Sequence, residues 1–256
     1  MTIRAKAPMR VCFGGGLLDV FPINAIIGGY TVNAAIDKFV TVEIEDGEGL
    51  KINAKKEELP RLLANIYNLK NKTITVSEDV FGYRGFAQSA ALGVALGFAV
   101  TGDKEIAELI SYETENKMLG VVGGYQDQIV ASRGGFNIIT NRAGVYSVET
   151  LTDFNQDFLD KIKKAIPFYS KAYAHSGLKN EEVVDKVVAG DKETISILKE
   201  LRNCTEHIVL ALREQNAGEF IKWCLEERRH HDKLRQREGE QLVEYNFEFE
   251  GVRKID

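Results

Sequence analysis

The sequence has 256 residues, of which 44% are hydrophobic, so the chain can bury the core of one large domain or of two fused lobes. Its net charge of −5 and isoelectric point near 5.6 argue against nonspecific nucleic-acid binding, because no basic excess is available to neutralise phosphates. Its three cysteines are widely separated, which favours neither a disulfide framework nor a CxxC metal site. The longest apolar run, 90–100, is too short to span a bilayer, so we expect a cytoplasmic protein without nucleic-acid or membrane partners.

The first eighty residues are predicted to be mainly β. Alternating apolar residues make 3–13 a strand, which Pro8 restricts to an edge or a bend, and the glycines at 14–16 end it. A long strand or a hairpin covers 30–45, where every second residue from 40 to 44 is a branched apolar one. The other elements predicted in this part are two short strands and a helix between them, at 50–54, 73–77 and 57–67.

From Ser89 the pattern changes from alternating to helical. Residues 89–100 are apolar on nearly every face, as a buried helix would be, and Gly102 ends this helix. A second helix over 104–119 carries an apolar stripe, with Glu115 near its C-terminal end. Further along the chain we predict strands at 136–140 and 168–174, and helices at 154–165, 180–188, 192–215 and 217–236. The last two helices are expected to form an antiparallel hairpin.

The end of the chain contains three segments that need separate interpretation. Residues 243–249 alternate apolar or aromatic side chains with polar ones, which predicts a regular strand whose aromatic face belongs to the core. The charged run 226–229 is interpreted as a solvated helix face. His230, His231 and Asp232 are interpreted as surface residues rather than a metal site, because adjacent histidines on a helix point in different directions.

A candidate phosphate site lies where an irregular loop meets the first buried helix, at Gly85, Phe86, Ala87, Gln88 and Ser89. A helix N-terminus presents unpaired backbone N–H groups and a partial positive charge, so this junction could receive a phosphate. Ser89 could then offer its hydroxyl to the metal ion that accompanies the phosphate. The alternative is that Ser89 only caps the helix and that the small residues permit close packing.

Acidic residues supply the second candidate site. Glu115 and Asp127 lie on either side of the glycines at 120–124 and could be a metal ligand and a base. A carboxylate that holds Mg²⁺ neutralises phosphate charge, while an Asp beside an acceptor hydroxyl orients or deprotonates it for in-line attack. The alternatives are a solvated helix carboxylate and an Asp that caps a helix. Asp19 could accept hydrogen bonds from sugar hydroxyls, or it could simply form a turn.

Together these segments resemble the GHMP kinases, the superfamily of galactokinase, homoserine kinase and mevalonate kinase, and most closely the heptose 7-phosphate kinase branch. The resemblance covers the chain from Arg4 to about Asn141 and again the last fifteen residues or so. It rests on Lys-Ala-Pro-Met-Arg at 6–10, on Gly-Gly-Gly-Leu-Leu-Asp-Val at 14–20, on Asn-Ala-Ala-Ile-Asp at 33–37 and, most specifically, on 115–136. Leu18 stands where that branch usually has a Thr.

The resemblance implies an α+β, GHMP kinase-like two-lobed fold. Residues 1–150 would form a β-rich N-terminal lobe like domain 2 of ribosomal protein S5, and 151–256 a helical C-terminal lobe, truncated relative to the family. It implies phosphorylation of a sugar or sugar phosphate by direct in-line transfer, with ATP and Mg²⁺ as cofactors, and a homodimer is possible. The implied site residues are Asp127 facing the acceptor hydroxyl, Ser89 and Glu115 on Mg²⁺, the backbone of 85–89 on phosphate, and Asp19, Gly15, Gly16 and Gly124 on the sugar.

Two departures from the family pattern keep a second hypothesis open. The family's phosphate loop reads Pro-Pro-Gly-x-Gly-Leu-Gly-Ser-Ser, and 81–89 retains only Gly85 and Ser89 of it. Ala87 adds a Cβ where the backbone could need a positive φ, and Tyr83 and Arg84 put bulk where the triphosphate would lie. The glycine-rich third motif is missing before the last strand, so either the chain is shortened or that motif belongs to residues outside this sequence. The second hypothesis is a catalytically inactive relative that binds a ligand or another protein.

Overall fold

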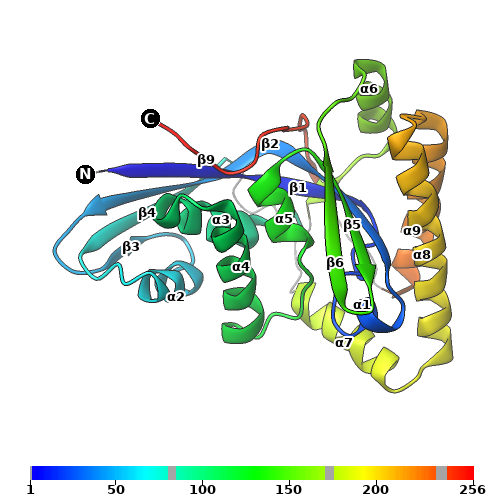
Figure 1. The fold of residues 1–256 in the computed structure, drawn as a ribbon, viewed down its shortest axis with the longest axis horizontal. Coiled ribbons are helices and arrows are strands. Elements are labelled where there is room, and N and C mark those ends of the chain that lie inside the picture. The colour runs from blue at the N-terminus through cyan, green and yellow to red at the C-terminus, as the bar shows by residue number, and fades with distance from the viewer. Residues whose placement is uncertain (1, 80–84, 171–175, 235–240) are drawn as a thin grey trace.

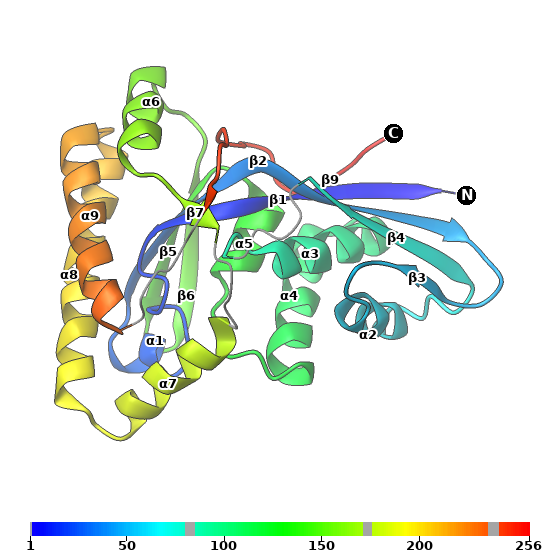
Figure 2. The ribbon, with the colours of Figure 1, turned by 180° about the vertical axis from the view of Figure 1, so that it is seen from behind.

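The computed structural model describes residues 2–79, 85–170, 176–234 and 241–256, which form a mixed α+β fold built on a seven-stranded sheet (Figures 1 and 2). Strands β3, β4, β2, β1 and β9 are neighbours in that order, β5 also pairs with β2, and β6 pairs with β5. The strands are β1 (Ile3–Gly14), β2 (Gly29–Asp46), β3 (Lys51–Asn53), β4 (Lys72–Glu78), β5 (Phe136–Arg142), β6 (Val145–Leu151), β7 (Tyr169–Ser170), β8 (Gln241–Leu242) and β9 (Arg253–Lys254).

Helices α2, α3 and α4 lie below strands β1 and β2 in Figure 1, α5 also packs on these two strands, and α8 and α9 run side by side at the other end of the molecule. The helices are α1 (Ile23–Ile26), α2 (Glu58–Ile66), α3 (Gln88–Thr101), α4 (Lys104–Glu113), the π-helix η1 (Thr114–Met118), α5 (Gln126–Arg133), α6 (Gln156–Ala165), α7 (Ser176–Val188), α8 (Lys192–Arg213) and α9 (Ala217–Leu234). No helix among the described residues is long and apolar enough to cross a membrane.

Strand β2 is the element on which the sheet is assembled. It is antiparallel to β1 along most of its length, while its first part pairs with β5 and its second part pairs with β4. The register between β1 and β2 shifts between Pro8 and Met9. Pro8 has no N–H to donate to a ladder, so an irregularity at this position is the bend that the sequence predicted.

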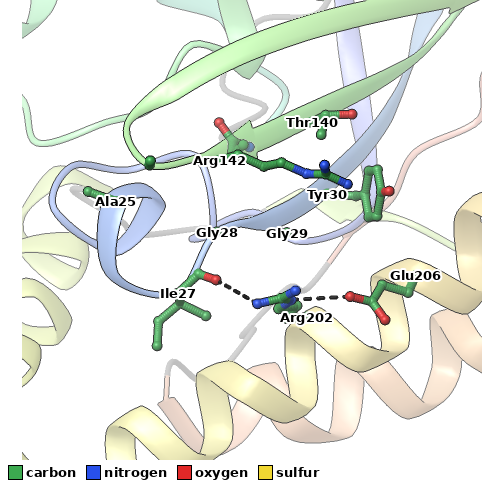
Figure 3. Close-up of a pocket in the computed structure, with 11 residues that line it drawn as sticks. Ala25, Ile27, Gly28, Gly29, Tyr30, Thr140, Arg142, Arg202 and Glu206 are labelled. Atoms are coloured by element: carbon green, nitrogen blue, oxygen red, sulfur yellow. Dashed lines mark hydrogen bonds and ion pairs between the residues drawn. The ribbon is translucent and has the colours of Figure 1, made fainter.

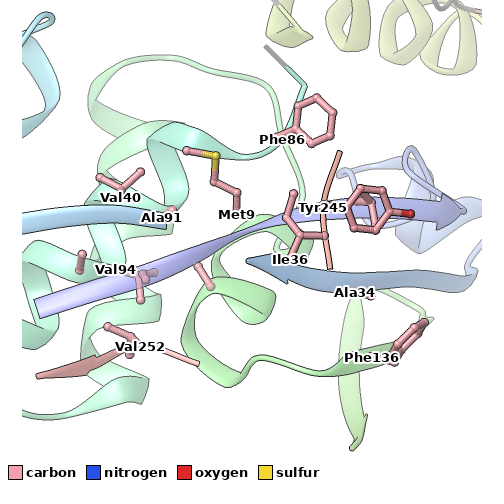
Figure 4. Packing of buried hydrophobic residues seen from close by; sticks show 14 of the residues in the cluster. Met9, Ala34, Ile36, Val40, Phe86, Ala91, Val94, Phe136, Tyr245 and Val252 are labelled. Atoms are coloured by element: carbon pink, nitrogen blue, oxygen red, sulfur yellow. The ribbon is translucent and has the colours of Figure 1, made fainter. Parts of the chain in front are cut away.

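Helix α3 is buried along most of its length, as its apolar composition predicted. Its glycines let α4 approach closely, because a Cβ on Gly93 would lie 2.2 Å from the hydroxyl oxygen of Ser111. The core then continues across β1 and β2 to an aromatic group around Phe136, and residues of the terminal segment such as Tyr245 complete it (Figure 4). This single cluster draws residues from both predicted lobes.

Most predicted elements are confirmed to within a few residues, including the long strand, the buried helix and the α8–α9 hairpin. The strand predicted at 168–174 is present as β7 alone, and 171–174 lie outside the described residues. The predicted helix over 217–236 is present as α9, and 235–236 also lie outside them. The helix predicted to run to residue 119 changes at Thr114 into the π-helix that carries Glu115. Strand β6 was not predicted.

The prediction of a regular strand over 243–249 is wrong. Its aromatic side chains do pack on the core, but its backbone bonds to several partners in turn. The N–H of Val243 donates to Phe168, that of Glu248 donates to Ala35, and only Phe247 forms a bridge, with Ile36. The period-two pattern therefore reports the alternation of side chains correctly, but it does not establish a continuous ladder.

Two predictions about α9 are also wrong. Glu227, in the supposedly solvated run, is fully buried, and His231 is 5% exposed rather than on the surface. The helix packs against α8 and β1, so one stripe of α9 must turn inward despite its polar composition. Glu227 is acceptable there because it accepts a hydrogen bond from the backbone N–H of Gly15, at 3.0 Å.

Candidate functional site

Asp127 lies in the first turn of α5, where the partial positive charge of the helix N-terminus favours a carboxylate. It does not cap the helix, because the N-cap position is Tyr125. The guanidinium of Arg10 on β1 contacts a single oxygen of Asp127, with Nε at 2.8 Å and Nη2 at 2.6 Å from Oδ1. Oδ2 accepts no hydrogen bond from any residue that the structure describes, and the Asp127 side chain is 32% exposed.

Arg10 also holds the candidate phosphate loop. Its Nη1 donates to the carbonyl oxygen of Gly85 at 2.8 Å, and its backbone N–H donates to that of Phe86 at 3.1 Å. Burial acts to lower the pKa of Arg10, but the charge of Asp127 and its hydrogen bond outweigh it, so the pKa is raised and the group stays charged. One arginine thus connects the candidate base to the loop that precedes α3.

The candidate phosphate loop turns into α3 at Ala87, which has φ +60° and ψ +36°. The left-handed conformation expected at this position is therefore present, although the residue is not glycine. Ser89 lies within the first turn and is not the N-cap, which is Ala87, a residue whose side chain makes no capping hydrogen bond. Tyr83 and Arg84 lie outside the described residues.

Glu115 and Ser89, the two residues that the sequence analysis proposed for a metal site, lie near one another. The Glu115 carboxyl is 8% exposed and accepts a hydrogen bond from the side-chain amide of Gln128, and the nearby Ser89 hydroxyl also favours its charged form. Burial raises the pKa of Glu115 to about 7, because the hydrogen bonds only partly offset the cost of desolvation and the charge of Asp127 adds to it. No group of three or more His, Cys, Asp or Glu that could hold a metal occurs among the described residues.

Asp19 is fully buried at the N-terminus of α5. Its Oδ2 accepts from the backbone N–H of Gln126 at 3.1 Å, and its Oδ1 accepts from the Gln126 side chain at 3.2 Å. Gly124 packs directly on this carboxyl, because a Cβ there would lie 1.9 Å from Oδ2. Burial raises the pKa of Asp19 to about 7 in spite of its two donors. Asp19 and Gly124 therefore form one closely packed wall beside Asp127.

The other two glycines predicted to contact the sugar, Gly15 and Gly16, differ in their surroundings. Gly15 has φ +76°, and a Cβ on it would lie 2.0 Å from the carbonyl oxygen of Tyr30, so only glycine fits there. Its N–H is already bonded to Glu227. The carbonyl of Gly16 is 3.5 Å from the side-chain nitrogen of Gln126, which places Gly16 next to the Asp19 wall.

The structure thus gathers the predicted residues around the start of α5 and the start of α3, and it adds three that the sequence did not single out. Arg10, Gln126 and Gln128 supply the hydrogen bonds that hold Asp127, Asp19 and Glu115. A signal for Arg10 was present in the sequence, because it is a charge between the buried residues of an apolar strand. No local pattern distinguishes Gln126 and Gln128 from other polar residues in a first helical turn.

Comparison with known proteins confirms the resemblance inferred from the motifs. No family model matches the sequence. The chain is 33% identical over 171 residues to D-glycero-alpha-D-manno-heptose 7-phosphate kinase of Campylobacter jejuni subsp. jejuni serotype O:2. That match covers 54% of this chain and 50% of the relative, so the chain spans about half the length of the curated protein it matches.

Solved structures of kinases share the fold. A D-glycero-D-manno-heptose 1-phosphate kinase from Bacteroides thetaiotaomicron superimposes with a TM-score of 0.76 at 20% identity, covering 99% of both chains. Mevalonate kinase of L. major in complex with R-mevalonate has a TM-score of 0.66 at 12% identity and covers 90% of this chain and 75% of that one. A protein named MDDEF, in complex with MVAPP, AMPPCP and magnesium, has a TM-score of 0.56 at 10% identity, with 91% and 75% covered.

Proposed function

Since the chain has the fold of the GHMP kinases and resembles a heptose 7-phosphate kinase in sequence, we propose that it phosphorylates a sugar or sugar phosphate with ATP and Mg²⁺. Transfer is direct and in line, from the nucleotide to a hydroxyl group of the sugar. A heptose phosphate is the first substrate to test, because it is the one named for the sequence relative.

The connection between Arg10 and Asp127 carries this proposal. Arg10 occupies Oδ1 of the partly exposed Asp127 side chain, which leaves Oδ2 to accept a hydrogen bond from the acceptor hydroxyl. The same guanidinium reaches Gly85, so the hydroxyl would be oriented at a defined place relative to the phosphate loop. Phosphoryl transfer depends mostly on such positioning and on charge stabilisation, and the positive charge of Arg10 serves both.

The donors at the start of α3 fit a metal–nucleotide complex. Glu115 and Ser89 offer a carboxylate and a hydroxyl, which are hard oxygen ligands of the kind Mg²⁺ takes beside substrate phosphates. A single protein carboxylate is enough in such sites, because water and phosphate oxygens fill the remaining positions. Bound there, Mg²⁺ would neutralise charge on the phosphates. The backbone of 85–89 and the N-terminal end of α3 would bind the phosphates themselves.

The wall formed by Asp19 and Gly124 is the proposed sugar-binding side of the site. Asp19 is fully buried, so it reaches a sugar hydroxyl only if the Gly124 loop moves aside. Without that movement Asp19 acts by fixing Gln126, and through it the first turn of α5 that carries Asp127. Gly15 and Gly16 keep the preceding turn close to this wall.

The test is ADP release in the presence of Mg²⁺, ATP and a panel of heptose phosphates and hexoses. We expect turnover with at least one member, and Asp127→Asn should reduce it by about 10²- to 10⁴-fold without abolishing ATP binding. Asp157→Asn is the matched control, since Asp157 is an exposed helix carboxylate paired with Lys161 on α6. Absence of ATP binding at millimolar concentration would contradict the proposal and would favour a catalytically inactive relative.

A further inference from the structure

A pocket with a volume of about 240 Å³ lies apart from the residues around Asp127, Glu115 and Ser89 (Figure 3). Its lining comes from the segment that joins α1 to β2, from the end of β5 and from α8. It shares no residue with the group around Asp127, Glu115 and Ser89. Binding of a ligand in this pocket can therefore be tested separately from the proposed kinase activity.

Arg202 on α8 is held in place at one side of this pocket. Its Nη1 donates to the carbonyl oxygen of Ile27 at 3.2 Å, and its Nε pairs with Oε1 of Glu206 at 3.1 Å. Its stem packs over Gly29, where a Cβ would lie only 3.1 Å from Cγ of Arg202. The side chain is still 52% exposed, so its remaining donors can reach a ligand. Because its position is already fixed, binding would cost little further side-chain entropy.

Arg142 supplies a second guanidinium from the end of β5. The residue is exposed, and its side chain forms no hydrogen bond or ion pair with any residue that the structure describes. In Figure 3 its side chain extends towards Tyr30, above the Gly28–Gly29 backbone, while the Arg202 head group lies below it. Two guanidinium groups thus border one pocket that contains a single carboxylate, that of Glu206, and the pocket carries a net positive charge.

We propose that this pocket binds the phosphate monoester of a small polyhydroxy compound. Guanidinium forks match the geometry of phosphate oxygens, and two of them on one pocket suit a doubly charged group. Glu206, Thr140 and Tyr30 also line the pocket, and their oxygens can bond to hydroxyl groups of the same ligand. The volume lies below the range of about 300–1,000 Å³ usual for drug-sized ligands, which favours a small metabolite.

The experiment uses the intact protein and three probes: inorganic phosphate, glycerol 3-phosphate and uncharged glycerol. Calorimetry measures affinity, and the backbone amide resonances of Gly28 and Gly29 report where binding occurs. We expect glycerol 3-phosphate to bind more tightly than inorganic phosphate, glycerol to give no signal, and the two glycine resonances to shift. Arg142→Gln should weaken binding at least about tenfold, because it removes charge-assisted hydrogen bonds.

The matched control is Arg61→Gln on α2, an exposed arginine at the opposite end of the molecule, which should leave binding unchanged. Arg142→Gln should fold normally, since the Arg142 side chain makes no hydrogen bond or ion pair with the described residues and its backbone pairing with Val145 is kept, and a thermal melt checks this. Three results would overturn the proposal: no binding of either anion, shifts confined to 85–89, or equal affinity in the wild type and Arg142→Gln. Equal affinity for glycerol 3-phosphate and inorganic phosphate would overturn the assignment of a polyhydroxy ligand.

Discussion

The contact between Gly124 and Asp19 gives a sharp test of how the candidate site is built. A Cβ placed on Gly124 would lie 1.9 Å from Oδ2 and 2.1 Å from Cγ of Asp19, far inside van der Waals contact. The carboxyl cannot easily move, because Gln126 holds both of its oxygens. Gly124→Ala should therefore force a shift of the loop or of α5, at a cost of about 1–3 kcal/mol in the free energy of unfolding.

A double-mutant cycle isolates this contact. Asp19→Ala alone is also destabilising, since it leaves the buried N–H of Gln126 without its acceptor. Asp19→Ala removes the carboxyl atoms with which the new Cβ would overlap. In that background Gly124→Ala should therefore lower the free energy of unfolding by less than about 0.5 kcal/mol. The expected coupling energy between the two positions is accordingly about 1–3 kcal/mol.

Urea unfolding, followed by the fluorescence of the single tryptophan, Trp223, measures the free energy of unfolding of the wild type, the two single variants and the double variant. Gly123→Ala is the control, because a Cβ there meets only one atom within 4 Å, at 3.9 Å, and the residue has no positive φ. That variant should change stability by no more than about 1 kcal/mol, in the stabilising direction. If Gly124→Ala costs as much in the Asp19→Ala background as in the wild type, the close packing described for this wall is wrong.

Three further predictions concern neighbouring groups. Because the pKa of Asp19 is raised to about 7 in the folded state, its stabilising contribution is present below about pH 4 and lost as the pH rises through 7; urea titrations should show this fall, and Asp19→Asn should reduce it. Glu227→Ala should destabilise the fold by about 1–3 kcal/mol by leaving Gly15 N–H without an acceptor, whereas Glu227→Gln retains one, and a comparison of their thermal melts checks this. Glu115→Gln and Ser89→Ala should each raise the Mg²⁺ concentration needed for half-maximal activity in a metal titration, and an unchanged requirement would remove them from the metal site.

Much of the fold was readable from local patterns, because hydrophobic periodicity depends only on which residues lie next to one another along the chain. The apolar run at 89–100 predicted the buried α3, and the alternation in 30–45 predicted the long β2. The same reasoning failed for 243–249, where alternating side chains pack correctly but the backbone finds separate partners. Periodicity describes which faces are buried, and it does not specify hydrogen-bond partners.

The residues of the candidate site also fall into those that the sequence identified and those that only the structure revealed. The acidic pair Glu115 and Asp127, the glycines between them and the helix start at Ser89 were identifiable, because they lie in short segments with a distinctive composition. The left-handed conformation of Ala87 was also foreseeable, since it follows from the backbone geometry expected of a glycine-type loop.

Tertiary structure alone decided how these residues are held. Arg10 meets Asp127, Asp19 meets Gly124 and Glu227 meets Gly15 across long stretches of chain, and no spacing in the sequence encodes such contacts. The sequence by itself therefore determined the fold class and which carboxylates could carry chemistry. Packing determined that Asp127 is partly exposed and paired with an arginine, and that Asp19 and Glu115 are buried with raised pKa values. Desolvation and charge pairing depend on neighbours that only folding brings together.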